Sequence, residues 1–295
     1  MFYLAHISDI HLTPLPEPSW KELFNKRITG YINWKKNRNN SLSKDSLEKL
    51  ILNIHNKKPD HITVTGDLVN LALDKEFQQA NLWLKTLGRP EDISLVLGNH
   101  DVYLKDSYEK ACQTFSLWMR SDNKKSIDFP YYKQRADIAI IGACSAIPTP
   151  PFCAAGFFSE IQAQKLTNLL LDAKKNKLFR IILIHHPPIY KATSKYKSLF
   201  GIKRFQQCIR KAGAELILHG HTHIPTTTFI EGKDKKVPVI GVSAASQAFD
   251  GKHWPASYNW FEIFKENQLW HCKLSRHFIV DAENNIRREN TIQLF

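Results

Sequence analysis

Side chains that bind divalent metal ions recur along this chain in short groups, and each group follows a run of apolar residues. The groups are Asp9 with His11, Asp67, Asn99 to Asp101, His185 with His186, and His219 to His223. Hard and borderline divalent ions prefer carboxylate, amide oxygen and imidazole ligands. The groups contain all three and no cysteine. The pattern is typical of a hydrolase that works with two metal ions.

The apolar runs before these groups are short and rich in β-branched residues and leucine, which predicts buried strands. They cover residues 2–7, 61–65, 93–97, 180–184 and 215–218. In an α/β sheet, the loops at the carboxyl ends of the strands line one crevice, so residues far apart in the sequence can converge there. We therefore expect all of the groups to form one site.

The remaining pattern alternates helices with strands. Amphipathic spacing and caps predict helices over about 44–58, 73–87, 105–119 and 159–174, and further strands are expected at 137–142, 226–230, 237–242, 258–264 and 268–274. The last two strands should form a hairpin across Glu266 and Asn267. The expected fold class is α/β, with two mixed β-sheets packed face to face and helices on both outer sides.

In chain order the motifs read Asp-x-His, Gly-Asp, Gly-Asn-His-Asp, His-His-Pro-Pro and Gly-His-Thr-His. This series closely resembles the calcineurin-like metallophosphoesterase superfamily. Residues 66–68, 97–101 and 219–223 are most similar to the class III cyclic-nucleotide phosphodiesterase group. The resemblance implies a four-layer α/β/β/α sandwich, and because the motifs must share a site we expect one domain over residues 1–295.

The resemblance also implies a ligand set for two divalent ions, with manganese, iron, zinc and magnesium all open as their identity. The first ion would be held by Asp9, His11 and His223, the second by Asn99, His185 and His221, and Asp67 would bridge both. A carboxylate suits a bridge because it has two anionic oxygens. Of the adjacent histidines, His185 is chosen as the ligand and His186 as a lining residue, while His6 and His219 are expected to be buried, hydrogen-bonded neighbours.

Two ions about 3.5–4 Å apart would polarise a phosphoryl oxygen and lower the pKa of a shared water, so a metal-bridging hydroxide is the expected nucleophile. By the same resemblance, Asn99 and His100 would contact the substrate phosphate, and His100 would stabilise its charge or protonate the leaving oxygen. Asp101 would fix the tautomer of His100 through a hydrogen bond. These residues predict a hydrolase acting on a phosphodiester or phosphomonoester.

Composition limits the other classes of protein. No pattern of a signal peptide is present and no apolar run is long enough to cross a bilayer, so we expect a cytoplasmic enzyme. The five cysteines are scattered without a Cys-x-x-Cys pair, which predicts reduced, mostly buried thiols. The net charge of +13, from 41 basic and 28 acidic residues, suits an anionic substrate.

An unusual insertion of basic and aromatic residues covers about 13–40, and its spacing predicts one or two short helices over the mouth of the site. The alternative is a helix packed on the body with a solvated basic face. The insertion could bind nucleic acid, which would make the protein a nuclease, or an anionic membrane, which would suit a phospholipid-type substrate. A non-catalytic scaffold is the remaining reading. Together with the insertion, the loop at 149–158 and the stretch at 190–205 are expected to select the leaving group.

Overall fold

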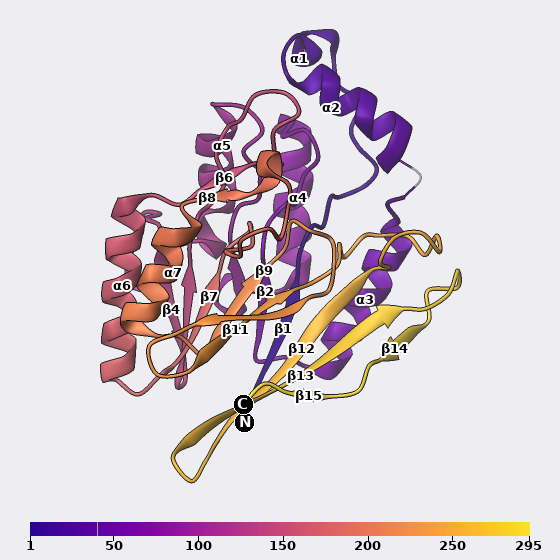
Figure 1. Cartoon of the computed structure of the whole chain (residues 1–295). Helices are drawn as coiled ribbons and strands as arrows, with labels where there is room; N and C mark the ends of the chain where they lie inside the picture. Colours follow the sequence, from indigo (N-terminus) through magenta and orange to yellow (C-terminus); the bar gives the residue numbers. More distant parts are fainter. Residues whose placement is uncertain (40) are drawn as a thin grey trace.

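The computed structural model describes residues 1–39 and 41–295, and two mixed β-sheets form its centre (Figure 1). The first sheet contains β14 (Ile286–Arg288), β13 (Leu269–Ile279), β12 (Ser257–Glu266), β1 (Phe2–Ile7), β2 (His61–Val64) and β3 (Ile93–Leu95), with β15 (Ile292–Gln293) paired to β13. The second contains β10 (Thr227–Glu231), β11 (Lys236–Gly241), β9 (Leu216–His219), β7 (Phe179–Leu183), β5 (Ile138–Gly142) and β4 (Tyr131–Arg135). A short parallel pair, β6 (Gly156–Phe157) and β8 (Leu199–Phe200), lies outside both.

Helices connect the strands and cover the outer faces of the sheets. They are α1 (Trp20–Leu23), α2 (Arg27–Asn33), a π-helical turn (Trp34–Arg38), α3 (Lys44–Lys57), α4 (Asp74–Leu87), α5 (Ser107–Phe115), α6 (Glu160–Lys175) and α7 (Ile202–Ala212). Short 3₁₀ turns occur at Pro90–Asp92, Ser116–Trp118 and Lys195–Lys197. The side chains of Ser43 and Ser159 cap α3 and α6 as expected, because each accepts a hydrogen bond from the backbone N–H three residues later.

The layering follows from the alternation of side chains along the second sheet. On β7, Ile181 joins the core cluster shared with the first sheet, whereas Ile182 joins the cluster formed with α6 and α7. On the other side, Leu50 of α3 and Phe77 of α4 belong to the same core cluster as the first sheet. The result is helix, sheet, sheet, helix, so the predicted fold class is confirmed.

The strand directions decide where the loops converge. β1, β2 and β3 run parallel to one another, and so do β5, β7, β9 and β11. The carboxyl ends of β1, β2 and β3 therefore emerge at one edge of the first sheet, and those of β7 and β9 at one edge of the second. The metal-binding groups follow these same strand ends.

Most predicted elements are present within a few residues, including the β12–β13 hairpin, whose turn residues Asn267 and Gln268 have positive φ. The sequence predicted no helix or strand within residues 190–205. This stretch contains β8 and the beginning of α7. The missed signal is the spacing of Ile202, Phe205 and Ile209, which are buried along one side of α7.

All five cysteines are free, and Cys144, Cys208 and Cys272 are buried. No helix in the described part of the chain is long and apolar enough to span a bilayer.

His61 at the start of β2 provides a test of the core. Burial, and then the charges of Lys133 and Arg135, lower the pKa of His61 well below its ordinary value. The unfolded chain therefore binds a proton at this residue as the pH falls below about 6.5, and the folded chain does not, so stability is lost toward acid.

The free energy of unfolding of the unchanged protein should fall as the pH is lowered from about 7.5 to about 5.5. We expect this fall to be about 1.4 kcal/mol smaller in His61→Gln, which lacks the titrating imidazole. Denaturant titrations at both pH values, with chelator present, measure this difference. The same substitution at exposed His253 is the control, and equal acid sensitivity of His61→Gln and the unchanged protein would contradict the assignment.

Candidate metal centre

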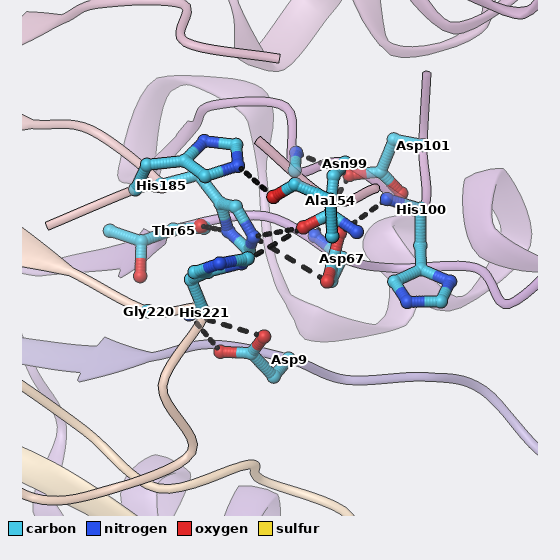
Figure 2. A network of polar contacts seen from close by, with 12 residues as sticks. Asp9, Thr65, Asp67, Asn99, His100, Asp101, Ala154, His185, Gly220 and His221 are labelled. Atoms are coloured by element: carbon cyan, nitrogen blue, oxygen red, sulfur yellow. Dashed lines mark hydrogen bonds and ion pairs between the residues drawn. The ribbon is translucent and has the colours of Figure 1, made fainter. Parts of the chain in front are cut away.

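All seven predicted metal-binding side chains lie together where the carboxyl ends of the two sheets meet, and many of them are drawn in Figure 2. Sets of candidate ligand atoms lie within 4.8 Å of one another: Asp9, His11 and His223 in one set, and Asp9, Asp67 and His185 in another. Asn99 joins them through its side-chain oxygen, which lies 2.9 Å from His221 Nδ1 and 3.2 Å from His185 Nε2. Each sheet contributes part of the site.

Asp9 connects the loop after β1 with the loop after β9. Its Oδ1 lies 3.1 Å from His223 Nε2, and its Oδ2 accepts a hydrogen bond of 3.0 Å from the backbone N–H of His221. Burial opposes ionisation, but the charge of His223 holds the pKa of Asp9 well below its ordinary range. Asp9 is therefore a buried carboxylate anion.

Asp67 occupies the centre of the cluster, and its two oxygens have different surroundings. Its Oδ1 accepts a hydrogen bond of 2.7 Å from the backbone N–H of His100. Its Oδ2 lies 3.4 Å from His185 Nε2 and 3.8 Å from His11 Nε2. Of the two oxygens, Oδ2 is the one that lies near imidazoles of both predicted metal positions.

Hydrogen bonds on the far side of each imidazole fix the tautomers. His11 Nδ1 lies 3.1 Å from the carbonyl oxygen of Val69, and His185 Nδ1 lies 2.6 Å from that of Thr65. A carbonyl oxygen only accepts, so each Nδ1 carries a hydrogen and the Nε2 of each ring is directed toward Asp67.

The same reasoning applies to His221. Its Nε2 lies 2.9 Å from the carbonyl oxygen of Lys197, which leaves the lone pair of Nδ1 directed at Asn99 Oδ1.

The residues fit a pair of cations because electron-pair donors face one another without a hydrogen between them. His11 Nε2 is buried and has no hydrogen-bond partner, although Asp67 Oδ2 is nearby. Such an arrangement is costly unless a positive charge lies between the atoms. The nitrogen and oxygen atoms suit manganese, iron, zinc or magnesium better than a soft ion.

The electrostatics of His185 lead to the same conclusion. Burial opposes a charge on this ring, yet the carboxylates of Asp67 and Asp9 raise the pKa of His185 to about 9. The position beside Asp67 Oδ2 therefore stabilises a positive charge strongly enough to overcome desolvation.

His100 stands beside this cluster, with its ring edge-on to His11 at a centroid distance of 4.8 Å. Its Nδ1 donates to the carbonyl oxygen of Asn70 at 2.6 Å. Burial, and then the charge of Arg38, lower the pKa of His100 to about 4, so its ring is neutral. The predicted hydrogen bond from Asp101 to His100 is wrong, because Asn70 fixes this tautomer.

Asp101 instead accepts hydrogen bonds from four backbone N–H groups. Its Oδ1 binds those of Leu68 and Val69, at 2.8 and 3.2 Å, and its Oδ2 binds those of Asp67 and Gly98, at 2.9 and 2.8 Å. Burial and the charge of Asp67 raise the pKa of Asp101 to about 7, and the amide of Gly98 opposes this rise. The side chain fastens the loop after β2 to the loop after β3.

The other histidines take the positions expected of them. His186 has both ring nitrogens occupied, Nδ1 with Ser145 Oγ at 2.8 Å and Nε2 with the carbonyl oxygen of Ala154 at 3.1 Å. His6 and His219 are buried, and each has a hydrogen-bond partner.

The backbone carries strain where the ligands are presented. Five of the seven predicted ligands, Asp9, His11, Asp67, His221 and His223, have φ between 40° and 68°, a region that non-glycine residues seldom adopt. Close approach also requires glycine at two motif positions. A Cβ on Gly98 would lie 2.1 Å from Asp67 Oδ1, and one on Gly220 would lie 1.8 Å from Ser8 Oγ.

The sequence reasoning missed three residues that shape this site. Arg38 Nη1 lies 3.5 Å from His11 Nδ1, Asn70 orients His100, and buried Glu76 accepts hydrogen bonds from the backbone of Asn70, Leu71 and Leu73. For Glu76 a signal was present, since it is the third residue of α4, where acidic side chains cap helices. Arg38 belongs to the basic insertion, and no motif in the sequence placed it beside His11.

A four-layer sandwich with clustered Asp, Asn and His side chains at the carboxyl ends of its strands defines the class of dinuclear metallohydrolases. The model of the calcineurin-like phosphoesterase family matches residues 2–225, and the chain belongs to this family. It is a metal-dependent phosphoric ester hydrolase. A search of curated proteins found no match.

Solved structures show the same fold. A dimetal phosphatase from Danio rerio is 11% identical, with 93% of this chain and 95% of that chain covered at a TM-score of 0.62. A purple acid phosphatase from yellow lupin (Lupinus luteus) seeds is also 11% identical, with 99% of this chain and 53% of that chain covered at a TM-score of 0.61.

The amide cradle around Asp101 gives a prediction. In Asp101→Asn, the NH₂ group of the asparagine must face backbone N–H groups. At least one of these buried N–H groups then has no hydrogen-bond acceptor. We expect the free energy of unfolding to fall by about 2–4 kcal/mol.

Denaturant titration of the metal-free protein measures the loss. The control is Asp234→Asn, whose ion pair with Lys174 is exposed to solvent and should contribute little to stability. Equal stabilities of the two variants would show that Asp101 does not fasten the loops.

Proposed function

We propose that this protein hydrolyses a phosphodiester or phosphomonoester at a dinuclear centre built from the two sheet edges. One observation carries the proposal: Asp67 Oδ2 lies 3.8 Å from the Nε2 of His11 and 3.4 Å from that of His185, two residues that follow strands of different sheets. The first ion would be held by Asp9, His11 and His223, the second by Asn99, His185 and His221, and Asp67 would contact both. We also propose that residues 1–295 act as one domain, because neither sheet alone supplies the full set.

When bound, two divalent ions would supply positive charge to the phosphoryl oxygens and would lower the pKa of a water molecule, so that it can lose a proton and its oxygen can attack phosphorus. The residues around them hold the phosphate in line with that water. Asn99 and His100 border the place for the phosphate, and the guanidinium of Arg38 adds a positive charge on the same side as His11. Attack forms a phosphorus–oxygen bond as the bond to the leaving oxygen breaks.

His100 is suited to deliver the proton that the leaving oxygen needs. Its Nδ1 hydrogen is held by Asn70, so a second proton would be carried on Nε2. Its lowered pKa keeps it neutral in the free protein. A bound phosphate anion would raise that pKa, so protonation and substrate binding would favour each other.

The motif resemblance makes a cyclic nucleotide the first substrate to test. The alternatives are a nuclease acting on nucleic acid and a phosphoesterase acting on a membrane-associated phospholipid-type substrate. Turnover of bis-p-nitrophenyl phosphate, p-nitrophenyl phosphate, cyclic nucleotides and single-stranded DNA, each with manganese added, separates these classes. If the metal-loaded protein turns over none of these substrates, the non-catalytic scaffold is the interpretation that remains.

Asp67→Asn tests the metal centre. The amide removes the negative charge between the two imidazoles, so we expect loss of bound metal and nearly all turnover. Metal content measured by mass spectrometry and turnover of bis-p-nitrophenyl phosphate are the readouts. Asp60→Asn at the opposite end of β2 is the control, and it should retain both. An Asp67→Asn protein with substantial turnover would contradict the central role of this carboxylate.

His100→Ala tests the proton donor separately. We expect turnover to slow by roughly 10²–10⁴-fold, because the leaving oxygen loses its acid, while metal content stays unchanged. The slowing should be smaller for substrates with a good leaving group, such as p-nitrophenyl esters, than for alkyl esters. Loss of metal from His100→Ala would show that this residue is a ligand instead.

A further inference from the structure

The insertion at residues 13–39 buries one charged side chain and leaves several large apolar side chains exposed. The charged side chain of Arg27 is 7% exposed and donates to the carbonyl oxygens of Leu71 and Ala72 at 2.8 and 2.5 Å. The large apolar side chains face solvent instead: Trp20 is 86% exposed and Phe24 is 95% exposed. An apolar face turned away from the body indicates a surface that contacts something else.

This apolar face continues along α2 and beside a neighbouring loop. Ile28 and Ile32 lie one helical turn apart and are each about half exposed. Lys26 Nζ donates to Thr149 Oγ1 at 3.0 Å, which holds the loop of residues 149–153 against the insertion, and Phe152 in that loop is 90% exposed. Figure 1 shows α1 and α2 standing out from the sandwich. We call residues 20–36 with Phe152 the apolar tip.

Positive charge accompanies the apolar tip. Residues 13–39 contain six lysines and arginines and two glutamates. The side chain of one glutamate, Glu22, accepts hydrogen bonds from the backbone N–H and the hydroxyl of Ser19. Lys21, Lys35 and Lys36 are exposed beside the apolar side chains. We propose that the apolar tip docks onto an anionic lipid bilayer, with Trp20 and Phe24 entering the interfacial region and the lysines contacting lipid phosphates.

A bilayer fits these side chains better than a nucleic acid does. Isolated isoleucines gain free energy in the acyl boundary but cannot stack on bases in the way that aromatic rings do. The tip is also attached to the metal centre, since Arg38 at its end lies beside His11 and Gly30 packs so closely on Tyr103 that a Cβ would lie 2.2 Å from its hydroxyl. Docking would hold the centre close to the lipid surface.

Co-sedimentation with vesicles tests the inference without any need for turnover. The full-length protein should bind vesicles of phosphatidylcholine mixed with phosphatidylglycerol, bind pure phosphatidylcholine much less, and be released by raised salt. Trp20→Ser with Phe24→Ser should weaken binding at least about tenfold, because both side chains lose their apolar contact. Lys35→Gln with Lys36→Gln should weaken it about fivefold per lysine at low salt.

The matched control is Leu82→Ser with Leu269→Ser, which removes two exposed apolar side chains, 62% and 66% exposed, from α4 and the β12–β13 hairpin. This variant should bind like the unchanged protein. Thermal unfolding shows that each variant is folded. Turnover of soluble bis-p-nitrophenyl phosphate, which Trp20→Ser with Phe24→Ser should leave unchanged, tests the proposed function independently of vesicle binding.

Three results would overturn the inference. The first is no binding of the unchanged protein to the anionic vesicles, and the second is an equal loss in the control variant. The third is a different occupant of the tip: a dimer in solution that Trp20→Ser with Phe24→Ser converts to monomer, or single-stranded DNA bound in place of vesicles.

Discussion

The structure depends on one electrostatic constraint: buried imidazole nitrogens and side-chain oxygens are held close together around Asp67 Oδ2. Imidazole Nε2 atoms from both sheets are directed at this oxygen, because backbone carbonyl oxygens accept the hydrogens on the Nδ1 atoms of the same rings. Donors brought this close repel one another unless positive charge lies among them. The surrounding chain must therefore be stable enough to hold groups that would otherwise move apart.

That stability comes from the elements behind the site. Parallel strands in two packed sheets place their carboxyl ends at a shared edge, and the loops leaving them are fastened by charged side chains that bind backbone amides. Asp101 joins the loops after β2 and β3, and Glu76 holds the segment that supplies the carbonyl oxygen of Asn70. The left-handed conformations of Asp9, Asp67 and His223 persist because these contacts and the core determine them.

In the insertion, some side chains contact the body of the protein and others of the same type are exposed to solvent. Arg27 is turned inward and satisfied by carbonyl oxygens, and Arg38 adds charge next to His11. Trp20, Phe24, Ile28 and Ile32 are exposed, whereas Leu23 is buried and Tyr31 packs against the core. The insertion therefore combines a face that packs on the body with an exposed face that carries both apolar and basic side chains.

Local information in the sequence determined the order of strands and helices, because alternation and caps act over a few neighbouring residues. It also determined the identity of the seven candidate ligands, since each follows an apolar run and belongs to a motif with a fixed internal spacing. The sequence could not decide contacts that join distant segments.

The partner of His100 is a carbonyl oxygen, and every residue has one, so no side chain pointed to Asn70. Likewise, the different surroundings of the two oxygens of Asp67 and the inward turn of Arg27 arise from packing between elements. Only the tertiary structure could settle them, because these interactions depend on distances across the fold and not on neighbours along the chain.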